Sequence, residues 1–373
     1  MKQTTLQSQK NKLWFRILFL FFSILHLLLP TLNHYFYRTY TYDYGVYNFA
    51  FYDYAHLQIN PCPVYHNLHT VTFLQDHFSL SLMILSPLYW LLTPFAGTYS
   101  LLIIQWLCIV FGAFCTFQYV ECKFRNYKLG LFAMVYYFLI FNRFSAYQSD
   151  CNLAIIGAAL LPAFFYFFET KKTVPLVLVF SFLLFCREDF PLTLIFMCSF
   201  LMIINWKQKA RLKFASLLLL ISVSVLLTTF AYLIPLVENS EKRFSLFNYS
   251  ILGETPSQAA LFIIKYPVKA LSYLFVNHRE DSAWDGIKAS FYLVFGLSGG
   301  IFLVLRPVYL ICLLPLIAKK CLITHPFVGV MICITVLKSR PFYQYWCFRL
   351  FPALKPLNGK LFLQSLCVLQ LLW

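Results

Sequence analysis

Acidic residues are scarce in this chain, whose 373 residues include 14 aspartates and glutamates against 30 lysines and arginines. Charged residues of both signs make up only 12% of the sequence, whereas hydrophobic residues make up 60%. Apolar stretches repeatedly reach the ~20 residues that a helix needs to cross a lipid bilayer. This composition argues against a soluble globular protein and predicts an all-α, polytopic transmembrane helical bundle.

Metal-binding and nucleotide-binding motifs are also lacking. The 12 cysteines lie mostly in apolar segments, without the CxxC or Cys/His spacing that holds a metal. His66 and His69 are interpreted as loop histidines, because no other clear ligand accompanies them. The glycines of GLSGG, residues 296–300, lie inside an apolar segment and favour helix packing over phosphate binding. No nucleotide is expected as a cofactor, and a divalent cation is the candidate that stays open.

The net charge of +16 would indicate nucleic-acid binding in a soluble protein. Here the basic residues lie in short connections between apolar segments, where they set the orientation by the positive-inside rule. Membrane lipid is therefore expected as a partner, and nucleic acid is not. Six acidic residues fall instead on the opposite, outer side: Asp43, Asp53, Asp76, Asp150, Glu188 and Asp189.

The first apolar stretch, residues 14–32, follows Lys2, Lys10, Lys12 and Arg16 and so resembles a signal peptide. It is long for such a peptide, and no small-residue cleavage site follows it. The pattern predicts a retained first helix with a cytoplasmic N-terminus.

The short apolar run at residues 79–93 decides the topology. If this run crossed the membrane, Lys123, Arg125 and Lys128 would lie outside. If it lies along the outer surface as an interfacial helix, these residues return to the cytoplasm and the later loops agree. We therefore expect a long first outer loop, residues 33–97, that carries an interfacial helix.

The remaining spans then alternate in direction, at residues 99–120, 129–144, 151–168, 174–185, 192–206 and 214–236, with a further span at 289–305. Residues 1–318 are expected to form the transmembrane domain. Residues 319–373 look unlike further helices and are expected to be an atypical segment, truncated or frame-disrupted.

Three groups of residues on the outer side could carry chemistry. Asp43 lies in an aromatic-rich segment just beyond the first helix, where it is either a catalytic carboxylate or a solvated loop acid. Asp76 and His77 could accept a proton, orient a hydroxyl or help to hold a cation, although Asp76 could equally be a helix N-cap.

The third group is Arg187, Glu188 and Asp189, which interrupt an apolar stretch in the sequence CREDFP. Adjacent ionisable groups near membrane depth are costly unless they are paired or face a polar cavity. The alternative is a short loop at the membrane surface. Arg187 could pair with Glu188, with Asp150 or with a substrate phosphate.

Five pieces of the sequence occur together in a recognisable order: residues 42–55, residues 75–94, Gln105, residues 148–150 and residues 186–191. They resemble the DUF2079 family of membrane proteins, which is similar to the GT-C class of lipid-linked-sugar glycosyltransferases. The resemblance covers residues 42–315 and implies a location in the plasma (inner) membrane of a prokaryote. It implies that Asp43 is the catalytic or metal-associated carboxylate of the first outer loop, and that Asp76 and His77 face the same outer cavity. The sequence departs from the family after Asp150, where Cys151 and Asn152 replace the usual histidine.

The leading hypothesis is transfer of a sugar from a polyprenyl-phosphate donor to an acceptor on the outer face, with Asp43 as the general base. The expected substrate-binding residues are Asp76, His77, Asp150, Arg187, Glu188 and Asp189. One alternative is a transporter or flippase of a lipid-linked or anionic substrate. The other is a non-catalytic membrane scaffold.

Overall fold

The computed structural model describes residues 2–65, 72–140, 144, 147, 151–237, 249–278, 285–297 and 300–322. Every regular element in these residues is a helix, which confirms the predicted all-α class. The chain divides into two compact units, Met1–Arg243 with Val368–Trp373, and Phe244–Cys367.

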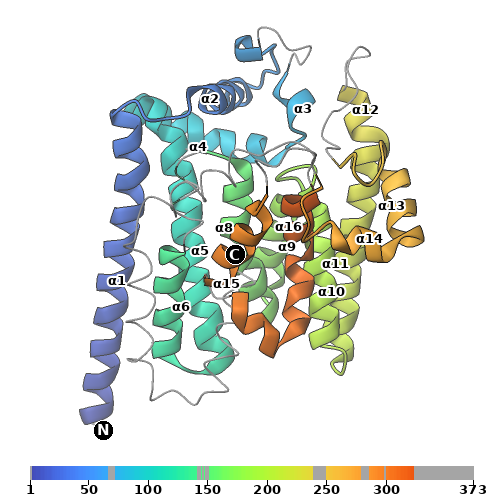
Figure 1. Ribbon diagram of the computed structural model, residues 1–373. Coiled ribbons are helices and arrows are strands. Elements are labelled where there is room, and N and C mark those ends of the chain that lie inside the picture. The colour runs from blue at the N-terminus through green and yellow to red at the C-terminus, as the bar shows by residue number, and fades with distance from the viewer. Residues whose placement is uncertain are drawn as a thin grey trace. The chain divides into compact units, whose positions relative to one another are not determined.

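The first unit is a bundle of helices (Figure 1). Its described helices are α1 (Lys2–Tyr35), α2 (Thr41–Ala55), α3 (Phe73–Asp76), α4 (Ser81–Ala96), α5 (Ser100–Phe124), α6 (Tyr127–Leu139), α8 (Leu153–Glu169), α9 (Thr173–Leu184), α10 (Phe190–Ile204), α11 (Lys209–Thr228) and α12 (Ile234–Val237). A one-turn π-helix, Thr229–Leu233, joins α11 to α12.

Three helical stretches of the described chain are long and apolar enough to cross a membrane: Gln9–Tyr35, Ser81–Phe124 and Lys209–Val237. The spans expected from residue 129 to residue 206 are present as the shorter helices α6, α8, α9 and α10, of 13, 17, 12 and 15 residues. At 1.5 Å per residue, a helix of 12 residues is about 18 Å long. The hydrocarbon core of a bilayer is about 30 Å thick. The three long stretches are therefore long enough to cross it, whereas a helix of 12 residues is not.

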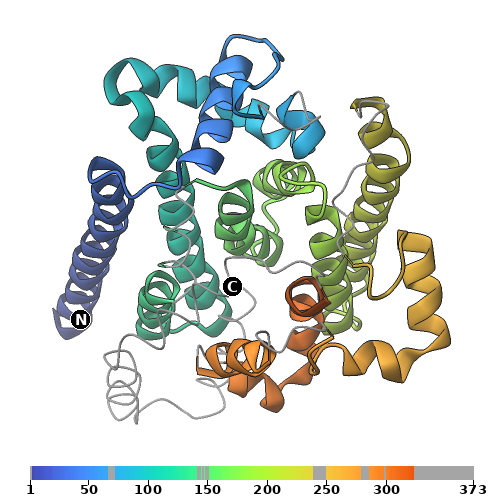
Figure 2. The same ribbon diagram turned by 45° about the horizontal axis from the view of Figure 1, so that its top comes forward.

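The interfacial helix expected at residues 79–93 corresponds to α4. Both α2 and α4 lie across one end of the bundle, crosswise to α1 and α5 (Figures 1 and 2). The chain turns from α4 into α5 at Gly97, whose φ of +53° favours glycine because a side chain would be strained there. The hydroxyl of Ser81 donates to the carbonyl of Phe182 at 2.5 Å, which fastens the start of α4 to the end of α9.

Helix α5 is central and packs against α1, α4, α6 and α8. Its closest approach is to α8, where Gly112 lies against the carbonyl of Ala159 and the Tyr137 hydroxyl. The surrounding core includes the fully buried Ile109 and Phe138. Small residues at such a contact let helix backbones approach closely, which is how helices associate without a hydrophobic driving force in lipid.

The charges of the first unit separate between its two ends. One end, here called the acidic end, carries α2, α3, α4 and the connection from α9 to α10; its acidic residues are Asp43, Asp53, Asp76, Glu188 and Asp189. The opposite end, here called the basic end, holds the connections that follow α5, α8 and α10; its basic residues include Lys123, Arg125, Lys128, Lys171, Lys172, Lys207, Lys209, Arg211 and Lys213. The separation predicted from the sequence is therefore present in space.

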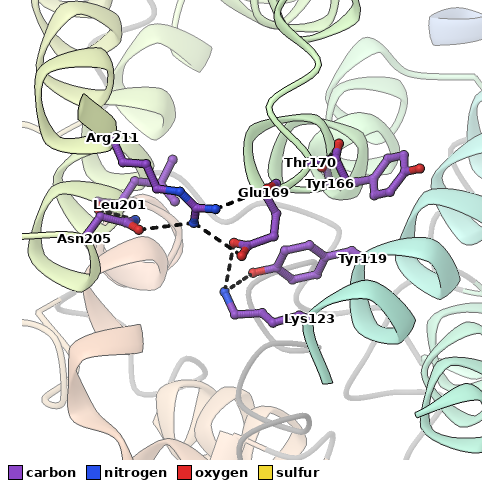
Figure 3. A network of polar contacts seen from close by, with 8 residues as sticks. All are labelled: Tyr119, Lys123, Tyr166, Glu169, Thr170, Leu201, Asn205 and Arg211. Carbon is purple, nitrogen blue, oxygen red and sulfur yellow. Dashed lines mark hydrogen bonds and ion pairs between the residues drawn. The ribbon is translucent and has the colours of Figure 1, made fainter. Parts of the chain in front are cut away.

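At the basic end, one carboxylate ties three helices together (Figure 3). The Glu169 carboxylate, at the end of α8, lies 3.3 Å from the Lys123 ammonium of α5 and 3.3 Å from the Arg211 guanidinium of α11. Lys123 also donates to the Tyr119 hydroxyl at 2.9 Å, and Arg211 donates to the Asn205 amide oxygen at 3.4 Å. The side chains of the three charged residues are 20% to 25% exposed, so the network is only partly screened by solvent.

The second unit contains α13 (Pro256–Lys265), α14 (Pro267–Ser272), α15 (Ile287–Leu297) and α16 (Leu310–Leu322). The span expected at residues 289–305 is divided into α15, of 11 residues, and a 3-10 helix at Gly300–Leu305. Two small apolar clusters hold the unit together, one around Leu303 and Leu313 and one around Leu252 and Leu322.

The contact at Gly112 gives the first testable prediction. Replacing a helical glycine with alanine normally stabilises a helix by up to about 1 kcal/mol. In Gly112→Ala the new methyl group would collide with the backbone carbonyl of Ala159, so we expect a loss of about 1–3 kcal/mol instead. Thermal unfolding of the purified protein in detergent measures the change.

The control is Gly296→Ala, because a Cβ at Gly296 in α15 would meet no atom within 4 Å. This variant should be as stable as the wild type or more stable. Equal stability of the two variants would contradict the close contact of α5 with α8.

The Glu169 network gives the second prediction. Glu169→Gln removes the one carboxylate that lies between Lys123 and Arg211, so two cations stay close together without compensation. We expect a loss of about 1–2 kcal/mol, between the values typical of exposed and buried ion pairs, measured as a lower unfolding temperature in detergent. Glu121→Gln is the matched control, because Glu121 lies in the last turn of α5 and pairs with no cation among the described residues. An equal loss in both variants would count against the network.

Candidate active site at the acidic end

Helix α2 holds Asp43 in its first turn, where the free backbone N–H groups of a helix favour a negative charge. The helix is fixed over α4 by a hydrogen bond of 3.0 Å from the Tyr89 hydroxyl to Asn48 and by stacking of the Phe51 and Tyr89 rings. The Tyr44 hydroxyl donates to the carbonyl of Thr98. Asp43 therefore lies on a rigid element and is half-buried, unlike a solvated loop acid.

Asp76 is the last residue of the short helix α3, and His77 follows it directly. Thr72 is the N-cap residue of this helix, and its backbone N–H donates to the Gln75 side chain at 3.0 Å. Leu80 is the N-cap residue of α4. Asp76 is thus an N-cap of neither helix, and its carboxylate instead accepts a hydrogen bond of 3.0 Å from the Tyr65 hydroxyl.

The connection between α9 and α10 brings in Arg187, Glu188 and Asp189. The Arg187 guanidinium lies 3.1 Å from the Glu188 carboxylate and 3.5 Å from the Asp189 carboxylate. The Glu188 side chain is only 4% exposed. This arrangement differs from a solvated surface loop, because Glu188 and Arg187 form a buried ion pair.

His77 joins these groups. Its imidazole lies 3.8 Å from the Asp76 carboxylate on one side and 3.8 Å from the Glu188 carboxylate on the other. His77 and Asp76 are also close enough to Asp43 to act on its charge. The structure therefore brings together all the predicted site residues that it describes: Asp43, Asp76, His77, Arg187, Glu188 and Asp189.

The two carboxyl groups at opposite edges of this cluster have opposite pKa shifts. Burial raises the pKa of Asp43, and the charge of His77 only partly opposes that rise. For Glu188, burial would raise the pKa, but the nearby His77 imidazole and the charge of Arg187 outweigh it and lower the pKa to about 2. Glu188 is thus held ionised, while Asp43 binds a proton more readily than an ordinary aspartate.

The other residues of the predicted motifs either have structural roles or are not among the described residues. Asp53 is buried and accepts hydrogen bonds of 2.7 Å and 3.1 Å from the backbone and side chain of Asn60, which closes the turn after α2. The Gln105 side chain accepts a hydrogen bond of 3.0 Å from the backbone of Asn152, which holds the start of α8 against α5. Asp150, His66 and His69 lie outside the described residues.

The tyrosines around the cluster were not predicted from the sequence. Tyr65 holds Asp76, and Tyr42 and Tyr47 lie close enough to Asp43, Asp76 or Arg187 for those charges to act on their phenols. With 25 tyrosines in the chain, no pattern distinguishes these three from the others.

The cluster carries more negative than positive charge. Four carboxylates, those of Asp43, Asp76, Glu188 and Asp189, lie near one guanidinium and one imidazole. Across the part of the chain that the structure describes, no group of three or more His, Cys, Asp or Glu side chains is arranged to hold a metal ion. Arg187 is already paired with two carboxylates, which limits how it could contact a phosphate.

The opposite pKa shifts give the third prediction, which concerns stability against pH. Because Glu188 has a folded pKa below its ordinary value, its ionised form stabilises the fold above about pH 4.5, and this contribution is lost as the pH falls toward 2. Glu188→Gln should therefore lower the unfolding temperature at pH 7, by an amount that shrinks in acid. Thermal unfolding in detergent from pH 3 to pH 8 measures it.

For Asp43 the sign reverses. A raised pKa means that the fold is more stable below that pKa and loses this stability as the pH rises through it. Asp43→Asn should leave the unfolding temperature at pH 7 unchanged or higher. Equal destabilisation by both substitutions would show that the two carboxyl groups do not differ in the way described.

Comparison with known proteins agrees with the helical architecture. The model of a family described as "Predicted membrane protein (DUF2079)" matches residues 33–337, a range that includes every residue of the cluster. No curated protein and no solved structure matches the chain. The family match extends over more than half of the sequence, and the chain therefore belongs to the DUF2079 family of membrane proteins.

Proposed function

We propose that this protein is a membrane glycosyltransferase that transfers a sugar from a polyprenyl-phosphate donor to an acceptor at the acidic end. The observation that carries the proposal is the state of Asp43, a half-buried carboxyl group with a raised pKa beside His77 and Asp76. A general base works best when its pKa lies close to the working pH, and burial moves Asp43 in that direction.

In this reaction Asp43 accepts the proton of the acceptor hydroxyl while the hydroxyl oxygen forms a bond to the anomeric carbon of the sugar. The bond from that carbon to the phosphate oxygen breaks, and polyprenyl phosphate leaves with the electron pair. Tyr65 orients Asp76, which lies beside His77. Asp76 and His77 can therefore position the acceptor hydroxyl next to Asp43, the base.

The leaving phosphate needs a cation nearby, because negative charge develops on it in the transition state. Arg187 is paired with Glu188 and Asp189. It therefore stabilises the buried side of the cluster, and these two pairs limit its contact with a phosphate. The His77 imidazole, between the Asp76 and Glu188 carboxylates, is the group that can donate a hydrogen bond to the donor phosphate.

The basic end is assigned to the cytoplasm by the positive-inside rule, which puts the acidic end and Asp43 on the outer face. This orientation fits a lipid-linked donor that is used outside the cell, in the inner membrane of a prokaryote. A divalent cation could assist if the donor phosphate brings it, since carboxylate oxygens are suitable ligands.

A transporter or flippase of a lipid-linked or anionic substrate is the second candidate. The buried pair of Arg187 and Glu188 favours it, because ionisable groups inside an apolar bundle also mark transport pathways. The excess of carboxylates in the cluster argues against a free anion as the substrate.

The fourth prediction tests transfer in cells that lack the protein, by mass spectrometry of polyprenyl-phosphate sugars and glycolipids. The wild type should remove an accumulated donor, whereas Asp43→Asn should reduce transfer at least ~100-fold, the usual contribution of a general base. Asp43→Glu should be poorly active because the carboxylate moves by one methylene group.

The matched control is Asp53→Asn, in the last turn of the same helix, which keeps an oxygen for one of the two hydrogen bonds from Asn60 and should restore the wild-type profile. An unchanged lipid profile in all strains would reject the transferase. Full rescue by Asp43→Asn would reject Asp43 as the base.

A further inference from the structure

The segment that contains α13 and α14 has an unusual composition. From Thr255 to His278 it has no acidic residue, and its only charged residues are Lys265 and Lys269. The two helices follow each other directly, with Tyr266 between them (Figure 1). They are 10 and 6 residues long, so neither can cross a bilayer, which takes about 20 residues.

One side of this segment is packed within the second unit. Ala259 is buried and contacts Leu252 and Leu322, and Phe262, Ala270, Tyr273 and Leu274 pack against the same cluster. The rings of Phe262 and Tyr273 stack with their centroids 6.1 Å apart, which links the two helices. These inward-facing side chains therefore attach the segment to the rest of the second unit.

The other side is also apolar, and among the described residues it is left exposed. Six large hydrophobic side chains are 58% to 80% exposed: Leu261, Ile264, Val268, Leu271, Phe275 and Val276. Leu261 and Ile264 are three residues apart, as are Val268 and Leu271, so each pair shares a face of its helix. Exposed apolar surface of this kind marks an interaction site in a folded protein.

Charge and aromatic placement indicate what covers this side. Lys265 and Lys269 are exposed within the apolar side chains, and the Lys265 ammonium lies 5.6 Å from the centre of the Tyr266 ring. Lysines with apolar stems, next to an exposed tyrosine, are suited to the zone where acyl chains meet phosphate headgroups. A helix with this pattern and no acidic residue binds anionic lipid in the plane of the membrane.

We propose that α13 and α14 form a membrane-resting element, with the six exposed hydrophobic side chains inserted among the lipid acyl chains and Lys265 and Lys269 on anionic headgroups. The element does not span the membrane. This inference is independent of the transferase, since it uses no residue of the Asp43 cluster.

The fifth prediction tests the depth of this element in the full-length protein, reconstituted in vesicles of phosphatidylethanolamine and phosphatidylglycerol. A fluorescent amino acid is introduced at Val268, which is 80% exposed, or at Ile264, which is 77% exposed. Lipids that carry a nitroxide near the headgroup should quench it more strongly than lipids that carry the nitroxide near the chain end, and aqueous iodide should quench it weakly. The control position is Glu254, an exposed charged residue that precedes the segment, where iodide should dominate.

Three outcomes would overturn the proposal. Strong iodide quenching at Val268 would show that this side faces water. Stronger quenching from the chain end than from the headgroup would place the segment in the hydrocarbon core. Protection from both lipid and iodide would show that protein covers it, either a second copy of the chain or another partner.

A second variant tests the charge. Raising the phosphatidylglycerol fraction from zero to one third should increase headgroup-level quenching at Val268 in the wild type, and the double variant Lys265→Gln, Lys269→Gln should lose this response. An equal response in both proteins would reject the contact of the lysines with anionic headgroups.

Discussion

The cost of charge in an apolar environment determines the arrangement of the first unit. An ionised group inside a bilayer is stable only when it is paired, hydrogen-bonded or in contact with water, so charges collect at the ends of a membrane bundle. Here each end also has its own ion pairs: Glu169 lies between Lys123 and Arg211 at the basic end, and Arg187 pairs with Glu188 at the acidic end. Both clusters join connections from different helices, so the same interactions that make burial tolerable also fix the ends of the bundle.

The acidic end becomes a site because α4 does not continue the direction of α5. The turn at Gly97 lays α4 across the bundle, and α2, which carries the half-buried Asp43, packs against it. If α4 and α5 formed one straight helix, Asp43 would have no layer beneath it. The half-buried environment that raises its pKa thus depends on a single change of direction in the backbone.

The sequence predicted this arrangement where charge and breaks in the apolar pattern are informative. The basic residues at 123, 125 and 128 predicted that the helix at 79–93 lies along the outer surface, with Asp43, Asp76 and Glu188 on that same side. The pair of Arg187 with Glu188 was one of three alternatives that the sequence offered. The contact of His77 with Glu188 was not predictable, because α9 and α10 are apolar on all sides and carry no pattern that fixes their rotation. Contacts such as Tyr65 with Asp76, or Gly112 with Ala159, likewise depend on three-dimensional packing that local sequence does not encode.

The contrast between Asp43 and Glu188 decides which carboxylate can be a base. Glu188 is almost completely buried, and its pKa is lowered by His77 and Arg187, so proton uptake would cost it these interactions. Asp43 is at the more accessible edge, and its pKa is raised because burial disfavours its charge. His77 lies between the two groups and connects them: by holding His77, Glu188 fixes the imidazole that sets the electrostatics around Asp43. In this arrangement Glu188 is a positioning residue for His77, and proton transfer belongs to Asp43.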